Sequence, residues 1–233
     1  MARLALIILL FMNLSQSFTR IPSSPLSIDA VNRRQEKLLK LDNSLGLGPG
    51  SPVFLRIFKE PKELEVWIKK DQQYVLFKIY TICYYSGTLG TKTRVGDNQA
   101  PEGFYVILPS SMNPASNYHL AFNIGYPNAY EKAKKYTGSE IMVHGDCVSI
   151  GCYAMGNENI EEIWTIMVKA FEKGQDVINL QIFPFRMTDQ NLQSHPQSTF
   201  HDFWLNLKEG YEYFENHKTP PLVMVEKGRY CFK

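Results

Sequence analysis

Residues 52–82 carry the pattern that most constrains the fold of this chain. Three runs, at 52–59, 63–69 and 74–82, are rich in β-branched and aromatic residues, and turn-forming residues separate them at 60–62 and 70–72. Apolar and polar residues alternate within the runs, as in LEVWIK at 64–69. Because alternate side chains of a strand point to opposite faces, these runs predict sequential antiparallel strands.

The rest of the chain predicts more strands with a few helices around them. We expect strands at 104–108, 118–125, 141–143 and 177–183, and the tail at 220–233 could pair as a final strand. Apolar residues at helical spacing predict helices at 28–41, 161–173 and 199–214. The polar residues at 131–136 predict a surface segment, and the glycine-rich segment 86–103 predicts an irregular loop of a kind that often lines a site. The expected fold class is mainly β with peripheral helices (α+β).

Charge gives little indication of a partner. The 233 residues carry 25 basic and 23 acidic side chains, a formal net charge of +2. A balance this close to neutral gives no electrostatic reason to expect nucleic acid as a partner. The sequence predicts no particular oligomeric state.

The first residues predict export. Arg3 precedes the apolar run 4–12, and the small residues Ser15 and Ser17 follow it. This order is typical of a secretory signal peptide; the alternative is a membrane anchor, but the run is shorter than the ~20 apolar residues of a spanning helix. We therefore expect a signal peptide at 1–17, a lead-in with a short helix at 18–50 and the main domain at 51–233. The exported protein would be periplasmic if the cell has an outer membrane.

One stretch, MVHGDCVSIGCYA at 142–154, brings chemically active side chains together. It holds one imidazole, His144, and two thiols, Cys147 and Cys152. We interpret Cys152 as a nucleophile. A cysteine attacks as its thiolate, and a free thiol is mostly protonated at neutral pH, so it needs a base, for which His144 is the nearest candidate in sequence. Backbone amides around Gly151 and Cys152 could stabilise the oxyanion that forms.

The residues alone leave other roles open for the four cysteines. Cys83 and Cys231 could be buried thiols or a pair, and Cys147 could form a reversible disulfide with Cys152. His144, Cys147 and Cys152 could also be three ligands of a zinc site whose fourth ligand comes from elsewhere. Inert core thiols and redox exchange are further alternatives, although the two thiols of the stretch are more widely spaced than in thioredoxin-like sites.

The same stretch resembles a known signature. His144-Gly145 followed by Ser149-x-Gly151-Cys152 resembles the HG...SHGC signature of the L,D-transpeptidase catalytic domain (YkuD type), a bacterial cell-wall enzyme family. The likeness is greatest with the YafK-like branch of that family. It extends over segments 52–60, 64–69, 100–105, 118–130, 183–188 and 202–211.

The resemblance implies a β-sandwich or barrel-like domain with a thiol site. Cys152 would form the acyl-enzyme and His144 would activate it, while the main-chain carbonyl of Gly145 would hold the other imidazole nitrogen. The amides of Gly151 and Cys152 would be the oxyanion donors. The resemblance implies neither a metal nor an organic cofactor.

The sequence departs from the wider family at positions that affect substrate binding. Ile150 stands where most members have a second histidine, Ala154 stands where many have an arginine, and the spacing between histidine and cysteine is shorter than usual. We expect His119 and Arg186 to compensate, as a polar group facing the site and as a fixed cation. The alternatives are a structural histidine and a surface salt bridge. Further candidates for contact with the substrate are Tyr118, Ser149 and Tyr153.

The substrates that the resemblance implies are the peptide stems of peptidoglycan, attacked at the carbonyl of the L-centre of diaminopimelate. An amine acceptor would make the enzyme a transpeptidase, and water would make it an amidase. The YafK-like branch is associated with hydrolysis that releases the outer-membrane lipoprotein from the wall, which favours the amidase and makes that lipoprotein a candidate partner. The alternative is a non-catalytic peptidoglycan-binding scaffold.

Overall fold

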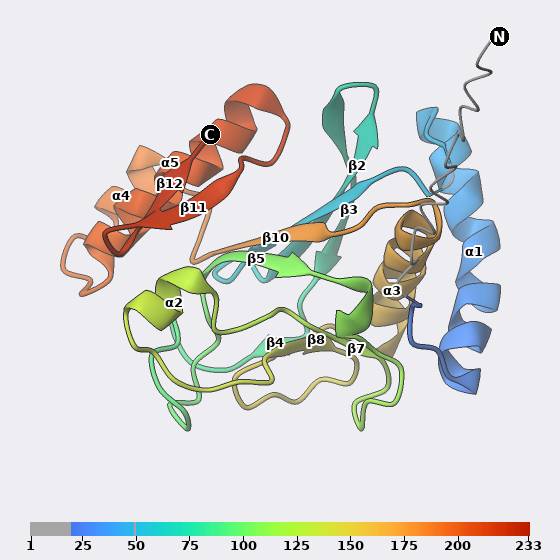
Figure 1. Cartoon of the computed structure of the whole chain (residues 1–233), viewed down its shortest axis with the longest axis horizontal. Coiled ribbons are helices and arrows are strands. Elements are labelled where there is room, and N and C mark those ends of the chain that lie inside the picture. Colours follow the sequence, from blue (N-terminus) through green and yellow to red (C-terminus); the bar gives the residue numbers. More distant parts are fainter. Residues whose placement is uncertain (1–19, 49) are drawn as a thin grey trace, which may run out of the picture.

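The computed structural model describes residues 20–48 and 50–233. Within these ranges the chain forms two five-stranded sheets that contribute to a shared core, with helices on the outside and a separate hairpin (Figure 1). The α+β class predicted from the sequence is confirmed. None of the helices in the described ranges is long and apolar enough to cross a membrane. The expected signal peptide at 1–17 lies outside the described residues.

The first sheet joins distant parts of the chain. Its strands are, in order, β3 (Gln73–Thr81), β2 (Glu63–Lys70), β1 (Val53–Phe58), β10 (Ile178–Phe183) and β5 (Gly103–Ile107). The antiparallel pairs β1–β2 and β2–β3 confirm the prediction from residues 52–82. β1 also pairs in parallel with β10, whose other edge is antiparallel to β5. All residues of β1 are buried, as expected for a strand with neighbours on both edges and layers on both faces.

The second sheet is built from short strands. Its order is β4 (Tyr84–Tyr85), β9 (Tyr153–Ala154), β8 (Met142–His144), β7 (Ala121–Asn123) and β6 (Met112–Asn113). The strand expected at 118–125 is shorter than predicted, because His119 has a φ of +67°, which lies outside strand geometry. The predicted alternation of side chains between two faces therefore does not extend to His119.

Two long helices pack against each other beside the sheets. They are α1 (Pro25–Leu45) and α3 (Asn157–Glu172), and Figure 1 shows them side by side. The apolar stripe of α3, including Ile163 and Met167, is buried in the core, as predicted. α3 begins at Asn157, earlier than the predicted residue 161, and its N-cap is Gly156.

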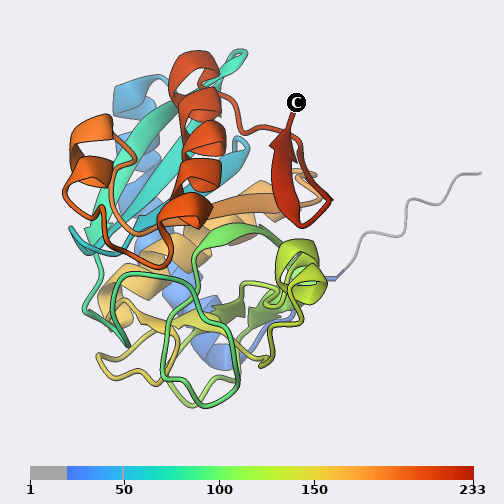
Figure 2. The ribbon, with the colours of Figure 1, turned by 90° about the vertical axis from the view of Figure 1, so that its left-hand side faces the viewer.

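A second, aromatic core lies on the other face of the first sheet. α5 (His201–His217) lies over this face (Figure 2), where Trp204 and Leu207 join Phe58 and Phe183. The tail predicted as a final strand forms β11 (Val223–Glu226) and β12 (Arg229–Phe232), which pair with each other. The remaining helices are α2 (Ala129–Ala133), α4 (Asp189–Gln193) and a 3₁₀ turn at Pro109–Ser111.

The prediction of a surface segment at 131–136 is wrong for Glu131. This residue belongs to α2, is 1% exposed, and accepts hydrogen bonds from the Asn128 amide and the Tyr105 hydroxyl. Burial raises the pKa of the Glu131 carboxyl to about 7, although these two hydrogen bonds oppose the shift. Glu131 is polar and yet buried because its side chain forms a capping box with Asn128 at the start of α2.

A buried ion pair fixes the irregular segment 86–102 to the first sheet. Lys59 follows β1 and Glu102 precedes β5, and both side chains are fully buried with 3.0 Å between Nζ and Oε1. The ammonium also donates to the carbonyl oxygens of Gly90 and Ala100 at 2.8 and 3.0 Å. Trp204 Nε1 donates to the other oxygen of Glu102 at 2.8 Å. Each hydrogen of the ammonium has an acceptor, the condition under which a buried pair is tolerated.

We predict that Glu102→Leu lowers the free energy of unfolding by about 3–5 kcal/mol, because it leaves the Lys59 charge buried without its counterion. Urea unfolding at pH 7 measures the change. The double variant Lys59→Met/Glu102→Leu should recover most of the loss. A Glu102→Leu variant as stable as the original chain would contradict this account of the segment.

Candidate active site

His144 is the last residue of β8, and two contacts fix its side chain. The imidazole Nδ1 lies 2.7 Å from the main-chain oxygen of Gly145. Because a carbonyl oxygen can only accept, Nδ1 carries the hydrogen and Nε2 is left as the basic nitrogen. The ring of Tyr118 packs against the imidazole with 4.9 Å between the ring centroids. His144 is 3% exposed.

Cys152 lies at the opposite end of the loop 145–152, directly before β9. Its side chain is a free thiol and is half-buried. The Met142 amide donates to Sγ at 3.4 Å, and the thiol lies 3.8 Å from the carbonyl oxygen of Glu140. The thiol is therefore held over the start of β8, the strand that ends in His144.

His144 and Cys152 line the same cavity, whose volume is about 350 Å³. Tyr118 and Ser149 also line it, together with Asn113, Ala115, Ser116, Asn117, Glu140, Met142, Val148 and Ile150. Among these lining residues, Glu140 is the only one with a formal charge at neutral pH. Ile150 and Ala154 supply no cation, because Ile150 is apolar and 81% exposed and Ala154 is buried in β9.

The two amides expected to hold an oxyanion already have acceptors. The Gly151 amide donates to the hydroxyl of Ser86, and the Cys152 amide donates to Ser149 Oγ at 2.8 Å. The Ser149 hydroxyl in turn donates to the Cys152 carbonyl oxygen at 2.8 Å. Stabilising an oxyanion with either amide would therefore require the displacement of a serine hydroxyl.

Burial keeps both reactive side chains neutral. It raises the pKa of the Cys152 thiol, while the Met142 amide and the charge of Lys92 act in the opposite direction. It lowers the pKa of His144, opposed by the hydrogen bond to Gly145 and by Asp146. Desolvation penalises the charged form of each group, so the resting pair is a thiol and a neutral imidazole rather than a thiolate and an imidazolium.

We predict that alkylation of Cys152 by iodoacetamide rises with pH and has its midpoint above the pKa of an unperturbed cysteine. The sign follows from burial, which disfavours the thiolate. Rates between pH 6 and 10, followed by peptide mass analysis, separate Cys152 from Cys231, the other free cysteine in the described residues. A midpoint below pH 7 would contradict the neutral pair.

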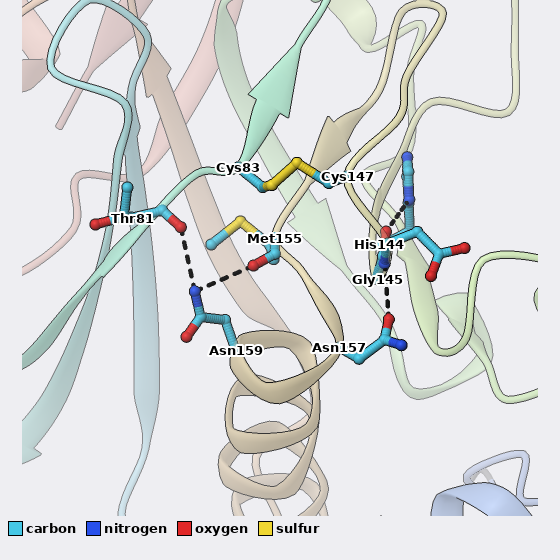
Figure 3. The surroundings of a disulfide bond; sticks show 9 residues. Thr81, Cys83, His144, Gly145, Cys147, Met155, Asn157 and Asn159 are labelled. Atoms are coloured by element: carbon cyan, nitrogen blue, oxygen red, sulfur yellow. Dashed lines mark hydrogen bonds between the residues drawn. A yellow bond between two sulfur atoms is a disulfide. The ribbon is translucent and has the colours of Figure 1, made fainter.

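A disulfide between Cys83 and Cys147 anchors the loop 145–152 (Figure 3). The two Cα atoms are 5.4 Å apart, and Cys83 directly precedes β4. At its other anchor, Asn157 Oδ1 at the start of α3 accepts from the Asp146 amide at 2.8 Å. Both neighbouring elements thus hold the loop close to His144.

The disulfide rules out two pairings that the sequence left open. Cys83 does not pair with Cys231, and Cys147 does not pair with Cys152. The disulfide also excludes the zinc site considered from the sequence. Cys147 is bonded to another sulfur, so it is not a thiolate ligand beside His144 and Cys152. The fold instead brings together two cysteines that are 64 residues apart, a pairing that the sequence did not single out.

We predict that Cys83→Ser/Cys147→Ser lowers the free energy of unfolding by about 4 kcal/mol, the chain-entropy value for a loop of this length. Chemical denaturation of the oxidised protein and of the double variant measures the difference. Cys231→Ser is the matched control and should unfold like the original chain. Equal stability of the double variant and the original would show that the disulfide does not constrain the chain.

Three of the residues expected to contact the substrate lie elsewhere. The imidazole of His119 binds Glu161 at 2.9 Å and does not line the cavity. Arg186 binds Glu63 and Glu65, the salt bridge considered as the alternative. Tyr153 is fully buried, and its hydroxyl donates to the Pro101 carbonyl oxygen at 2.7 Å. Tyr118 and Ser149 do line the cavity, as expected.

Sequence reasoning missed two residues that hold the loop. Ser86 accepts the Gly151 amide from a segment that is far away in the sequence. Asn157, at the start of α3, accepts from the Asp146 amide through its Oδ1. The glycine-rich pattern around Ser86 was the one available signal, since such segments often line sites.

The L,D-transpeptidase catalytic domain (YkuD) matches residues 61–178, which include β8, the loop 145–152 and β9. Because this match spans just over half of the chain, the chain belongs to the L,D-transpeptidase catalytic domain family. The resemblance found from the sequence is confirmed, including its YafK-like branch.

A curated relative supports the assignment along the whole chain. The Escherichia coli (strain K12) protein named "Putative L,D-transpeptidase YafK" is 44% identical over 230 residues, which cover 99% of this chain and 90% of the relative. Among solved structures, the helical cell shape determining protein Pgp2 from Campylobacter jejuni matches with a TM-score of 0.45 and 18% identity, covering 83% of this chain and 80% of Pgp2. Bd1075 from Bdellovibrio bacteriovorus has a TM-score of 0.41 and 17% identity, covering 76% of this chain and 78% of Bd1075.

Proposed function

We propose that this protein modifies peptidoglycan stem peptides through a Cys152 acyl-enzyme, at the carbonyl of the L-centre of diaminopimelate. The observation that carries the proposal is the shared cavity of His144 and Cys152 in a member of the L,D-transpeptidase family. The two residues lie at opposite ends of the loop 145–152, and a disulfide holds that loop in place. Neither a metal nor an organic cofactor has a role in the chemistry proposed.

The proposed reaction begins with proton transfer during attack. As Cys152 Sγ bonds to the substrate carbonyl carbon, its proton passes to His144 Nε2, the nitrogen that Gly145 leaves basic. The tetrahedral intermediate then collapses to a thioester, and the amine leaving group takes the proton from Nε2. Water or a second amine then attacks the thioester carbonyl, with His144 accepting its proton. Collapse of this second intermediate breaks the C–S bond, and the leaving Cys152 sulfur takes the proton back from His144.

The cavity has a charge that suits an ammonium-bearing substrate. Its only formally charged lining residue at neutral pH is the carboxylate of Glu140. A diaminopimelate-containing stem carries ammonium groups that this carboxylate can attract. The family arginine that would bind a substrate carboxylate has no counterpart here, because Ala154 occupies its place.

We favour water over an amine as the nucleophile that completes the reaction. The protein would then be an amidase that releases a peptidoglycan-bound outer-membrane lipoprotein, the outcome associated with the YafK-like branch. Transpeptidation is the competing outcome of the same acyl-enzyme. The lipoprotein and the stem peptides are the proposed partners.

We also propose a periplasmic location. The apolar run at 4–12 gives the export signal expected from the sequence. The Cys83–Cys147 disulfide supports it, because such bonds form and persist in oxidising compartments.

We predict that Cys152→Ala abolishes the covalent adduct and that His144→Ala slows its formation by about 10²- to 10⁴-fold, the usual contribution of a general base. Intact-mass analysis after incubation with a stem peptide or a carbapenem measures both. An adduct on the Cys152→Ala protein would refute the assigned nucleophile.

Purified sacculi that carry bound lipoprotein distinguish the outcomes of the acyl-enzyme. Mass analysis of the muropeptides identifies new cross-links, shortened stems or released lipoprotein, each by a different mass. Release of lipoprotein without new cross-links is the result expected for the amidase. Binding of muropeptides without any change in their mass would instead identify a non-catalytic scaffold.

A further inference from the structure

A buried carboxylate on α3 connects the N-terminal helix with the surroundings of His144. The Glu161 side chain is 5% exposed and binds Arg33 Nη2 at 2.7 Å and Arg34 Nε at 2.8 Å, both from α1. Its Oε1 also lies 2.9 Å from His119 Nε2. Burial alone would raise the pKa of Glu161, but the hydrogen bonds from Arg33, His119 and Arg34 hold it below its ordinary value.

His119 needs such a partner because of its backbone. Its φ of +67° is in the left-handed region, which costs a residue with a side chain of order 1 kcal/mol or more. Such a conformation persists only where its surroundings hold it. The imidazole, with 18% of its side chain exposed, is held by the Glu161 carboxylate.

The turn at 118–120 is also in direct contact with the active site. The carbonyl oxygens of Tyr118 and Leu120 both accept from the Gly145 amide at 3.0 Å. There is no space between the two segments, since a Cβ on Gly145 would lie 2.8 Å from His119 Cβ and from Tyr118 O. Gly145 is the residue whose carbonyl holds His144 Nδ1.

Tyr118 provides the second contact with His144. Its ring packs on the imidazole and lines the cavity. Both contacts that orient the imidazole therefore depend on this turn, because Gly145 is hydrogen-bonded to it and Tyr118 is part of it. His119 and Glu161 hold the turn in place. α1, which precedes the part of the chain that matches the family, reaches the active site through Glu161.

We propose that Glu161 and His119 are positioning residues for His144, and that α1 takes part in the active site by fixing the Glu161 carboxylate through Arg33 and Arg34. Only the expected effect on catalysis rests on the proposed function. The orientation of His144 can be measured without a substrate.

The neighbouring Glu162 provides a matched control on the same helix. It is as buried as Glu161, and it also pairs with α1, through Lys37 at 2.8 Å. Its other partners are Lys78 and the Tyr80 hydroxyl of β3, so it has no bond to the turn at 118–120. Glu161→Gln and Glu162→Gln therefore remove equivalent charges between α1 and α3, but only one of them changes the contact with His119.

The test compares the two variants in turnover and in the NMR signals of His144. For Glu161→Gln we predict a fall in kcat of about tenfold or more with KM within about twofold, because a misplaced base slows the chemical step. Nitrogen-15 spectra should show the Nδ1-protonated form of His144 in the original chain and a shifted or exchange-broadened signal in Glu161→Gln. Glu162→Gln should leave both measurements unchanged, apart from an effect on stability.

Variants of His119 test the same link from its other end. His119→Gln keeps a donor that can reach Glu161 and should retain more activity than His119→Ala, so a difference between them supports positioning even if Glu161→Gln folds poorly. If both glutamate variants change kcat and the His144 signals equally, or neither does, the inference fails. If the original chain forms no acyl-enzyme, the proposed function fails, while the His144 spectra still decide the positioning role.

Discussion

The short connection between β8 and β9 is the constraint on which the candidate active site depends. These strands are parallel neighbours, and residues 145–152 alone join them. Parallel neighbours usually need a crossover of about a dozen residues or more, most often through a helix. The loop runs from the end of β8 back to the start of β9, beside Met142, and its two ends stay close because β8 is only three residues long. His144 and Cys152 occupy those ends, so the connection itself brings the candidate base and the candidate nucleophile to one cavity.

Such a connection needs support from outside. The disulfide to Cys83, the Asn157 amide and the hydroxyl of Ser86 bind three different points along it. Cys83 and Ser86 flank β4 of the second sheet, and Asn157 lies at the start of α3, so the loop is held between that sheet and α3. The two hydrogen bonds use the backbone amides of Asp146 and Gly151, which would otherwise be free to bind a substrate. Rigidity and an open oxyanion site are therefore in competition here, and the serine hydroxyls are the groups that would have to move.

Local patterns in the sequence predicted the features that depend on near neighbours. Alternation at 52–82 correctly gave β1, β2 and β3, and helical spacing gave the buried face of α3. The pairing of β1 with β10 was missed, because nothing in either strand specifies which distant edge it joins. The site shows the same difference between local and distant contacts. The motif correctly located the thiol and the imidazole, but Arg186 and His119 bind carboxylates that are remote in sequence. A side chain that looks available for a ligand in the sequence is often already bound in the fold.

The pairing of the cysteines has a consequence for how the protein matures. Cys147 has a nearer neighbour in the sequence, Cys152, and the bond between these two would consume the sulfur that the proposed chemistry requires. The native bond joins Cys147 to a residue 64 positions away, so the chain has to bring β4 beside the loop before its thiols are oxidised. Molecules oxidised too early would contain the full sequence and yet be inactive until thiol–disulfide exchange repaired them. The share of molecules with a free Cys152 thiol thus depends on whether folding precedes oxidation.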